Sequence, residues 1–319
     1  MNRTFLSPAP PTVAVEIARH RVSAATVAVR DSRLSVTAHA TEPLPAGAVL
    51  PSLNATNIAD PIAVASALRR VFERMDTRPN RVALAIPDSV AKVSLLRFEK
   101  VPDRARDLEE LIRWQVRKAA PFRIEDSQIS YLPSLKASDG STEFVVVMAR
   151  KDIVREYEAA CEEAGAQAGV VDLATFNVIN AVLAGTQAPT DDWLLVHVTH
   201  EDATMAILRG DALVFFRNRI ADGEVGLTDM VHQTAMYYED RLSGTGFGRV
   251  VLAGGGSPAS QGGQDADYLR RALEQRLGIK VDSVDPRSAA TLMDRIGANT
   301  ELLDALAPLV GLLARERAA

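Results

Sequence analysis

The sequence predicts an α/β protein built from two related halves, with a small β-α-β-β subdomain inserted into the first half. A run of short apolar segments separated by turn residues occurs twice along the 319 residues. Each run is followed by an amphipathic helical pattern and then by a further short apolar segment. An additional group of strand and helix patterns lies between the two repeats. A duplicated unit of this kind determines the fold before any single motif does.

The repeated unit begins with three short strands. The first copy covers residues 13–39 and the second covers residues 194–220. In each copy, segments rich in Val, Ala and Leu alternate with turn-like residues, which is typical of strands joined by tight connections. The two copies keep a common register apart from a small difference in the length of the first turn. Each copy therefore predicts a three-stranded antiparallel meander.

A helix and a further strand follow each meander. The predicted helices have apolar residues at helical spacing and cover Ile62 to Met75 and Leu227 to Leu242. The strands after them are apolar throughout, as expected for strands buried on both faces, and cover Val82 to Ile86 and Val250 to Ala253. Three antiparallel strands, a helix and a parallel strand form the chain order of an RNase H-like or actin-like domain. We therefore predict duplicated actin-like domains.

The inserted subdomain covers about residues 90–150. Its patterns indicate a strand, an amphipathic helix and two further strands, at Lys92 to Phe98, Asp107 to Ala119, Ser127 to Leu135 and Glu143 to Ala149. The remaining segments predict helices at Ile153 to Ala164, up to Gly185 and at Asp267 to Leu277, and a strand at Val170 to Leu173. We place the first domain at residues 8–187 and the second at residues 188–319, joined by a hinge at Thr186 to Asp191.

Composition excludes several classes of function. The formal net charge is -5, from 36 basic and 41 acidic side chains, so we expect no nucleic-acid partner. The only cysteine, Cys161, cannot form an intrachain disulfide, and its acidic neighbours predict an inert, packed thiol. No stretch approaches the roughly 20 apolar residues that span a bilayer, and Met1 to Pro11 does not resemble a secretory signal. We therefore expect no direct membrane insertion.

Sequence motifs spread along nearly the whole chain form, when taken together, a pattern that is specific for one family. They are VALAIP at Val82 to Pro87, AAPF at Ala119 to Phe122, the acidic pair Glu125 and Asp126, MARKDIV at Met148 to Val154, VVDLATFNVINAV at Val170 to Val182, LAGGGS at Leu252 to Ser257 and APLVGLLAR at Ala307 to Arg315. With the order of the elements, they resemble the PilM family, actin-like proteins of the type IV pilus inner-membrane platform. They also resemble its relative, the division protein FtsA, although an FtsA-like filament former is not the favoured function.

The resemblance implies a role in assembly. A PilM-like protein would be a cytoplasmic scaffold of type IV pilus assembly, peripheral to the inner membrane of a bacterium through a partner. That partner is expected to be a PilN-like membrane protein, whose N-terminal cytoplasmic tail would dock in a groove beside the insert. Other pilus assembly proteins are expected as further partners. A type II secretion platform, whose cytoplasmic component has a similar fold, is the alternative system.

The resemblance also implies where a nucleotide would lie, because actin-like domains hold one between their halves. A Gly-rich turn after the parallel strand of the second half would receive the adenosine, since residues without side chains let it lie against the backbone. The residues that match this adenosine turn are Gly254, Gly255, Gly256 and Ser257.

The two turns that would hold the phosphates are changed. The family pattern Asp-x-Gly places a carboxylate near the magnesium ion and leaves backbone N–H groups open to phosphate oxygens. The corresponding residues are Glu16 and Ala18 in the first half and His197 and Thr199 in the second. We therefore predict a degenerate nucleotide site with no metal, no cofactor and no hydrolysis.

Nucleotide binding remains the alternative. The basic turn of Arg19, His20 and Arg21 could attract phosphate without a metal, although a solvated turn is the simpler interpretation. In that case the chain would be an ATP-binding switch or a weak ATPase of the same machinery, with ATP or ADP and Mg²⁺ as cofactor. A metal site at His197 and His200 is not expected, because the two side chains would point to opposite faces of a strand.

Overall fold

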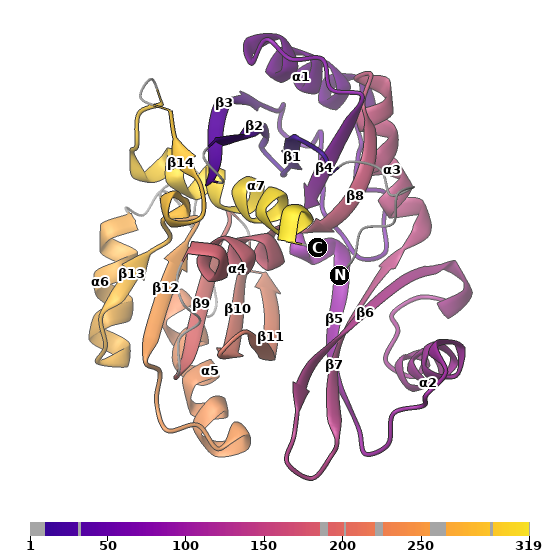
Figure 1. The fold of residues 1–319 in the computed structure, drawn as a ribbon, viewed down its shortest axis with the longest axis vertical. Coiled ribbons are helices and arrows are strands. Elements are labelled where there is room, and N and C mark those ends of the chain that lie inside the picture. Colours follow the sequence, from indigo (N-terminus) through magenta and orange to yellow (C-terminus); the bar gives the residue numbers. More distant parts are fainter. Residues whose placement is uncertain are drawn as a thin grey trace.

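The computed structural model describes residues 10–30, 33–185, 191–200, 202–220, 226–255, 266–293 and 296–318. Two large sheets lie one above the other in Figure 1, with helices on both faces of each. A small third sheet projects beside them and corresponds to the insert. The core is therefore divided among two related halves and a separate subdomain.

The first sheet has six strands in the order β14-β3-β2-β1-β4-β8. The strands are β1 (Val13–Ile17), β2 (Arg21–Arg30), β3 (Arg33–Pro43), β4 (Arg81–Ile86), β8 (Gln167–Leu173) and β14 (Thr291–Leu292). β1 pairs with β2 antiparallel and with β4 parallel. All residues of β1 are buried, which explains why its sequence lacks the polar alternation of a half-exposed strand.

Helices cover both faces of the first sheet. α1 (Pro61–Arg74) and α3 (Lys151–Glu163) pack on one face through a shared apolar cluster. α1 begins after Asp60, whose carboxylate accepts a hydrogen bond from the N–H of Ala63 at 2.9 Å. The other face is covered by α7 (Thr300–Ala318), which comes from the far end of the chain.

The second sheet repeats the plan of the first. Its order β11-β10-β9-β12-β13 corresponds to β3-β2-β1-β4-β8. The strands are β9 (Asp192–Val198), β10 (Asp202–Arg209), β11 (Ala212–Ile220), β12 (Arg249–Ala253) and β13 (Val281–Ser283). α5 (Leu227–Leu242) and α6 (Ala266–Leu277) cover one face, and α4 (Ala174–Gly185) covers the other. The predicted duplication is confirmed.

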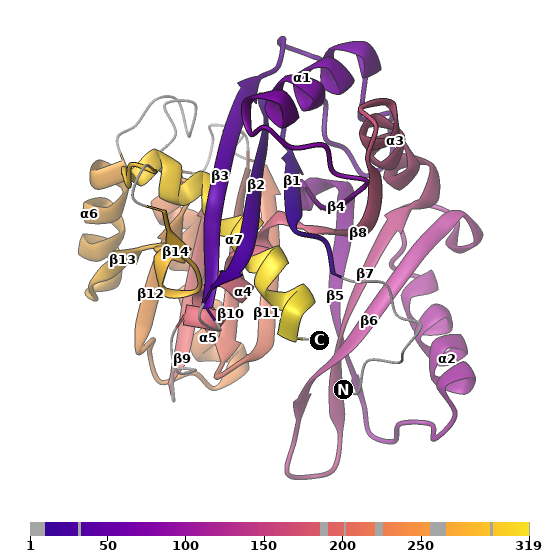
Figure 2. The ribbon, with the colours of Figure 1, turned by 45° about the horizontal axis from the view of Figure 1, so that its top comes forward.

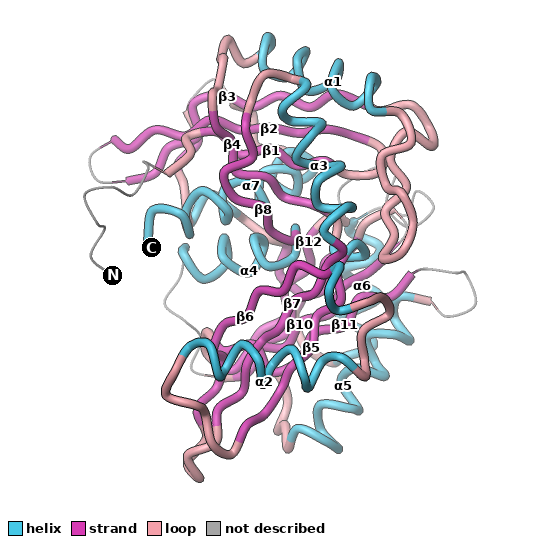
Figure 3. The backbone as a smooth tube through the Cα atoms, turned by 90° about the vertical axis from the view of Figure 1, so that its right-hand side faces the viewer, coloured by secondary structure: helices cyan, strands magenta, loops and turns pink. Residues whose placement is uncertain are grey.

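The insert forms its own sheet in the order β5-β7-β6. Its elements are β5 (Ala91–Phe98), α2 (Ala105–Arg117), β6 (Ser127–Lys136) and β7 (Thr142–Arg150). Ile112 and Val116 of α2 are buried against Phe144 and Met148 of β7. Figure 3, viewed from the side of the insert, shows α2 in front of these strands, so the helix covers the outer face of the small sheet. The predicted β-α-β-β subdomain is confirmed.

The final helices of the two halves lie side by side between the large sheets (Figures 1 and 2). α4 belongs to the first half in sequence but packs on the second sheet, and α7 does the reverse. Their backbones nearly touch, because a Cβ on Gly311 of α7 would lie 1.7 Å from the carbonyl oxygen of Asn177 in α4. The halves are therefore interlocked through their last helices.

The predicted helices and strands are present, with bounds that differ by a few residues. Among the strands and α-helices of the described residues, β13, β14 and the long helix α7 were not predicted. β13 and β14 are very short, and the apolar residues of α7 are interrupted by Pro308 and Gly311. Residues 186–190 of the predicted hinge lie outside the described residues.

Candidate functional site

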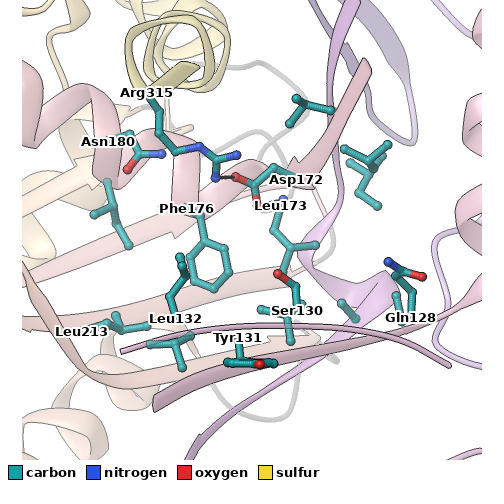
Figure 4. A pocket seen from close by; sticks show the side chains of 18 of the residues that line it. Gln128, Ser130, Tyr131, Leu132, Asp172, Leu173, Phe176, Asn180, Leu213 and Arg315 are labelled. Carbon is teal, nitrogen blue, oxygen red and sulfur yellow. Dashed lines mark hydrogen bonds and ion pairs between the residues drawn. The ribbon is translucent and has the colours of Figure 1, made fainter. Parts of the chain in front are cut away.

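A groove separates the insert from the two large sheets. Its volume is about 840 Å³, and its walls come from β6 and β7 of the insert, from α3, β8 and α4, and from the β10–β11 hairpin of the second half. Figure 4 shows the ring of Phe176 directed toward Leu132, with Tyr131 and Leu213 nearby. The middle of the groove is therefore apolar, and all three parts of the molecule shape it.

An ion pair borders the groove on the side of α7. The guanidinium of Arg315 donates to the carboxylate of Asp172, at the end of β8 (Figure 4). Burial raises the pKa of Asp172, while the charge of Arg315 and the N–H of Leu173 oppose this shift. The pair thus joins the last helix of the chain to the wall of the groove.

Hydrogen bonds connect the insert to its neighbours on both sides of the groove. The hydroxyl of Ser134 in β6 donates to the carbonyl of Leu213 in β11 at 2.6 Å. The ammonium group of Lys151 in α3 donates to the carbonyl of Glu125 at 2.9 Å. The position of the groove walls therefore depends on both halves.

The edge strands β8 and β6 contribute to the walls of the groove. Within the described part of the chain, β8 ends the first sheet and β6 ends the sheet of the insert, so each pairs along one side only. Residues of both strands line the groove. The unpaired backbone groups of an edge strand are able to pair with an additional extended segment.

The predicted phosphate turns lie where the two halves meet, a region here called the cleft, and the two turns share one geometry. The N–H of Ala18 donates to the carbonyl of Arg21 at 3.0 Å, and the N–H of Thr199 donates to the carbonyl of Asp202 at 2.9 Å. The Thr199 hydroxyl also donates to the carboxylate of Asp202 at 2.6 Å. Both N–H groups are therefore bonded within their own turns.

Glu16 and His197 occupy equivalent positions in the two sheets. Glu16 pairs with Ala85 of β4, and His197 pairs with Ala253 of β12. Arg21 donates to the carboxylate of Glu16 at 3.3 Å. His197 is buried, and this burial lowers its pKa, so a neutral imidazole is favoured.

The tips of the two turns meet across the cleft. The imidazole rings of His20 and His200 are 4.6 Å apart between centroids and nearly perpendicular. His20 and His200 directly follow the predicted phosphate-turn positions, two residues after Ala18 and one residue after Thr199. Side chains of the two halves thus contact each other there.

A buried polar network, here called the cleft network, lies deeper between the halves. It consists of Asp88, Thr175, His197, Thr204 and Asn218. Thr175 donates to Asp88 through its hydroxyl and its N–H, and Thr204 donates to Asp88 at 2.8 Å. Nδ1 of His197 lies 2.7 Å from the Thr175 hydroxyl, and Nδ2 of Asn218 lies 2.9 Å from the Thr204 hydroxyl. Burial raises the pKa of Asp88, and the three donors oppose this shift.

Sequence reasoning identified His197 but missed its partners. Asp88 follows the buried strand β4, and Thr175 follows the neighbouring parallel strand β8. Polar residues directly after adjacent parallel strands gather at one edge of a sheet, so this signal was present in the sequence. Thr204 gave no such signal, because it lies inside a strand.

Only part of the predicted adenosine turn lies within the described residues. Gly254 lies beside His197, and its N–H donates to the carboxylate of Asp304 in α7 at 2.9 Å. Gly255 is also described, whereas Gly256 and Ser257 lie outside the described residues. The structure therefore brings Glu16, His197 and Gly254 to the same cleft. The carboxyl groups of Glu16 and Asp304 oppose the effect of burial on the pKa of His197.

The described ranges lack two classes of feature. No group of His, Cys, Asp and Glu residues there has a geometry that could hold a metal ion. None of the described helices combines the length and apolar content required to cross a bilayer. Cys161 is buried, and this burial raises the pKa of its thiol to about 12.

Several solved structures resemble this chain. The structure of a PilM–PilN type IV pilus biogenesis complex is 20% identical, covers 97% of this chain and 99% of that chain, and gives a TM-score of 0.82. The cytoplasmic domain of EpsL, an inner-membrane component of the type II secretion system of Vibrio cholerae, is 11% identical, with coverage of 96% and 94% and a TM-score of 0.51. A protein of unknown function with an actin-like ATPase fold, from Bacteroides thetaiotaomicron, is 11% identical, with coverage of 88% and 92% and a TM-score of 0.49.

The predicted actin-like fold is confirmed by the two matching halves and by the likeness to the PilM–PilN complex over nearly the whole chain. The model of the family described as type IV pilus assembly protein PilM matches residues 14–241, which is more than half of the sequence. The chain therefore belongs to the PilM family of type IV pilus assembly proteins.

Proposed function

We propose that this protein is a cytoplasmic scaffold that docks the N-terminal tail of a PilN-like inner-membrane protein in the groove beside its insert. The docked tail would hold the scaffold at the inner membrane, where other pilus assembly proteins could join it. The solved PilM–PilN complex supports a PilN-like partner, since that relative shares the family and the fold.

The groove is the observation that carries this proposal. It combines an apolar middle, formed around Phe176 and Leu132, with two edge strands that offer unpaired backbone groups. An extended tail would form main-chain hydrogen bonds with β6 or β8 and place alternate side chains in the apolar middle. Binding an extended segment by its backbone and by every second side chain is a general mode of peptide recognition.

The geometry of the cleft favours a scaffold over a nucleotide-driven enzyme. A magnesium triphosphate requires free N–H groups in both turns and a carboxylate near the metal. The N–H groups of Ala18 and Thr199 are engaged within their turns, and Glu16 accepts a hydrogen bond from Arg21. His197, whose pKa is lowered by burial, supplies an imidazole where the family has a carboxylate. We infer that the phosphate turns no longer suit a magnesium triphosphate.

A binding measurement with a substitution in the groove tests the proposal. Leu132 lines the groove and its side chain is exposed, so Leu132→Glu should not disturb folding. A carboxylate at this position would lose its hydration when an apolar tail covers it. We expect the variant to bind a PilN-like N-terminal peptide at least tenfold more weakly than the unmodified chain, measured by isothermal calorimetry.

Ile62→Glu is the matched control. Ile62 is also an exposed aliphatic residue, but it lies on α1, away from the groove. This variant should bind the peptide as tightly as the unmodified chain does. Equal binding by Leu132→Glu, or no binding of PilN-like peptides to the folded chain, would refute docking in this groove.

A further inference from the structure

The hydrogen bonds of the cleft network all point toward Asp88. A threonine hydroxyl has one proton, so with Asp88 as a carboxylate Thr175 donates that proton to Asp88 and accepts from Nδ1–H of His197. By the same reasoning, Thr204 donates to Asp88 and accepts from the amide of Asn218. The network is thus a chain of donors that ends on a single carboxylate, an arrangement in which each bond polarises the next.

This chain joins the two sheets. Asp88 follows β4 in the first sheet, whereas His197, Thr204 and Asn218 belong to strands of the second sheet. Thr175 starts α4, the helix that leaves the first half and packs on the second. The bond from Thr204 to Asp88 therefore links segments that would separate if the halves moved apart, and Thr175 connects Asp88 of the first half to His197 of the second.

Burial makes these bonds costly to break. Asp88, Thr175, His197 and Thr204 are all buried, with exposed fractions of 4%, 0%, 7% and 1%. Separating the halves by a small distance would leave several of their polar atoms without a partner before water could reach them. The hydrogen bonds between these side chains thus favour the arrangement in which the two halves are in contact.

We propose that the cleft network is an interdomain lock, which holds the two halves together with side chains where an actin-like protein uses a bound nucleotide. The contact of His20 with His200 at the tips of the turns adds a second link above it. The lock concerns the relative position of the halves and does not depend on whether a tail occupies the groove.

Hydrogen–deuterium exchange on the full chain tests the lock. Thr204→Val keeps the shape of the side chain and removes the hydroxyl that donates to Asp88. We expect amides of the cleft, in peptides containing Ala18, Thr175 and Thr199, to exchange at least tenfold faster in this variant. Peptides from α1 and α2, remote from the cleft, should keep their rates, which separates opening of the cleft from global unfolding.

Two further variants make the comparison specific. Thr204→Ser retains the hydroxyl and should restore slow exchange in the cleft. Thr234→Val is the matched control, because Thr234 is equally buried in the second half but donates to Met230 within its own helix at 2.9 Å. It should leave the exchange of the cleft peptides unchanged.

A measurement with ATP and Mg²⁺ completes the test. Added to the unmodified chain, ATP with Mg²⁺ should leave exchange in the cleft unchanged, because the lock already holds the halves together.

The proposal is overturned if Thr204→Val exchanges no faster than Thr234→Val, or if ATP with Mg²⁺ slows exchange in the cleft tenfold. Should Thr204→Val fail to fold, Asp88→Asn takes its place, with the same expected and the same contrary result. A failure here would leave tail binding in the groove unaffected, so the two proposals are tested separately.

Discussion

Gly254 has a structural role that does not involve a ligand. Its φ of +78° lies in the left-handed region, and a Cβ would stand 2.0 Å from the carbonyl oxygen of Val198. Gly255 differs, because its φ is not positive and the nearest atom to a Cβ, in Leu252, is 3.5 Å away. The first glycine of the predicted adenosine turn is therefore required by packing against β9.

This contrast predicts different costs for the same substitution at adjacent positions. Gly254→Ala should lower the free energy of unfolding by about 3 kcal/mol, because the left-handed conformation and the close carbonyl both oppose a side chain. Gly255→Ala should change it by less than about 0.5 kcal/mol. Guanidinium unfolding measures both values. Similar losses in the two variants would show that the packing at Gly254 does not determine its identity.

At the scale of elements, the crossing of α4 and α7 sets the spacing between the halves. Each helix packs on the sheet of the other half, so the two must lie within one layer. Gly311 permits this approach, since a Cβ there would meet the backbone of α4 at 1.7 Å. Alanine favours a helix more than glycine does by about 1 kcal/mol, so propensity alone would select alanine at this position. The steric conflict between a Cβ at this position and the backbone of α4 outweighs the difference in helix propensity.

Gly311→Ala should therefore destabilise the protein although it raises helix propensity. We expect a loss of about 2 kcal/mol after that gain, because α4 and α7 must move apart. Gly297→Ala is the control, since a Cβ there meets no atom within 4 Å. Thermal or guanidinium unfolding compares the two. A Gly311→Ala variant as stable as the unmodified chain would contradict the close crossing.

At the scale of the whole molecule, the exchange of final helices makes the two halves mutually dependent. The apolar cluster on one face of the first sheet is completed by α7, and the corresponding cluster of the second sheet is completed by α4. Neither sheet keeps both faces covered without the other half. The ion pair of Arg315 with Asp172 and the cleft network reinforce this dependence.

Unfolding of the halves should consequently occur in one transition. Trp193 is fully buried in the second sheet and reports on that half, whereas the other tryptophan, Trp114, is exposed on α2. In a Trp114→Phe variant, the guanidinium midpoint from Trp193 fluorescence should coincide with the midpoint from far-UV circular dichroism. Two separate midpoints would indicate halves that fold independently.

The sequence predicted the repeated elements well because each carries a local signal. Strands buried on both faces appear as short apolar runs, and α1 and α5 show apolar residues at helical spacing. α7 was missed as an element because Pro308 and Gly311 lower helix propensity, while its burial between two sheets compensates for that loss. The sequence also located Glu16, Ala18, His197 and Thr199, since the repeat aligns them.

The sequence by itself determined the two halves, the insert and the family, and it predicted which residues take the positions of the phosphate turns. These features depend on residue types at fixed spacings along the chain. Only the tertiary structure decided what the changed residues contact, because Asp88, Thr175, His197 and Thr204 are distant in sequence and meet through the arrangement of two sheets. The groove has the same origin, since its walls come from three parts of the chain that no local pattern brings together.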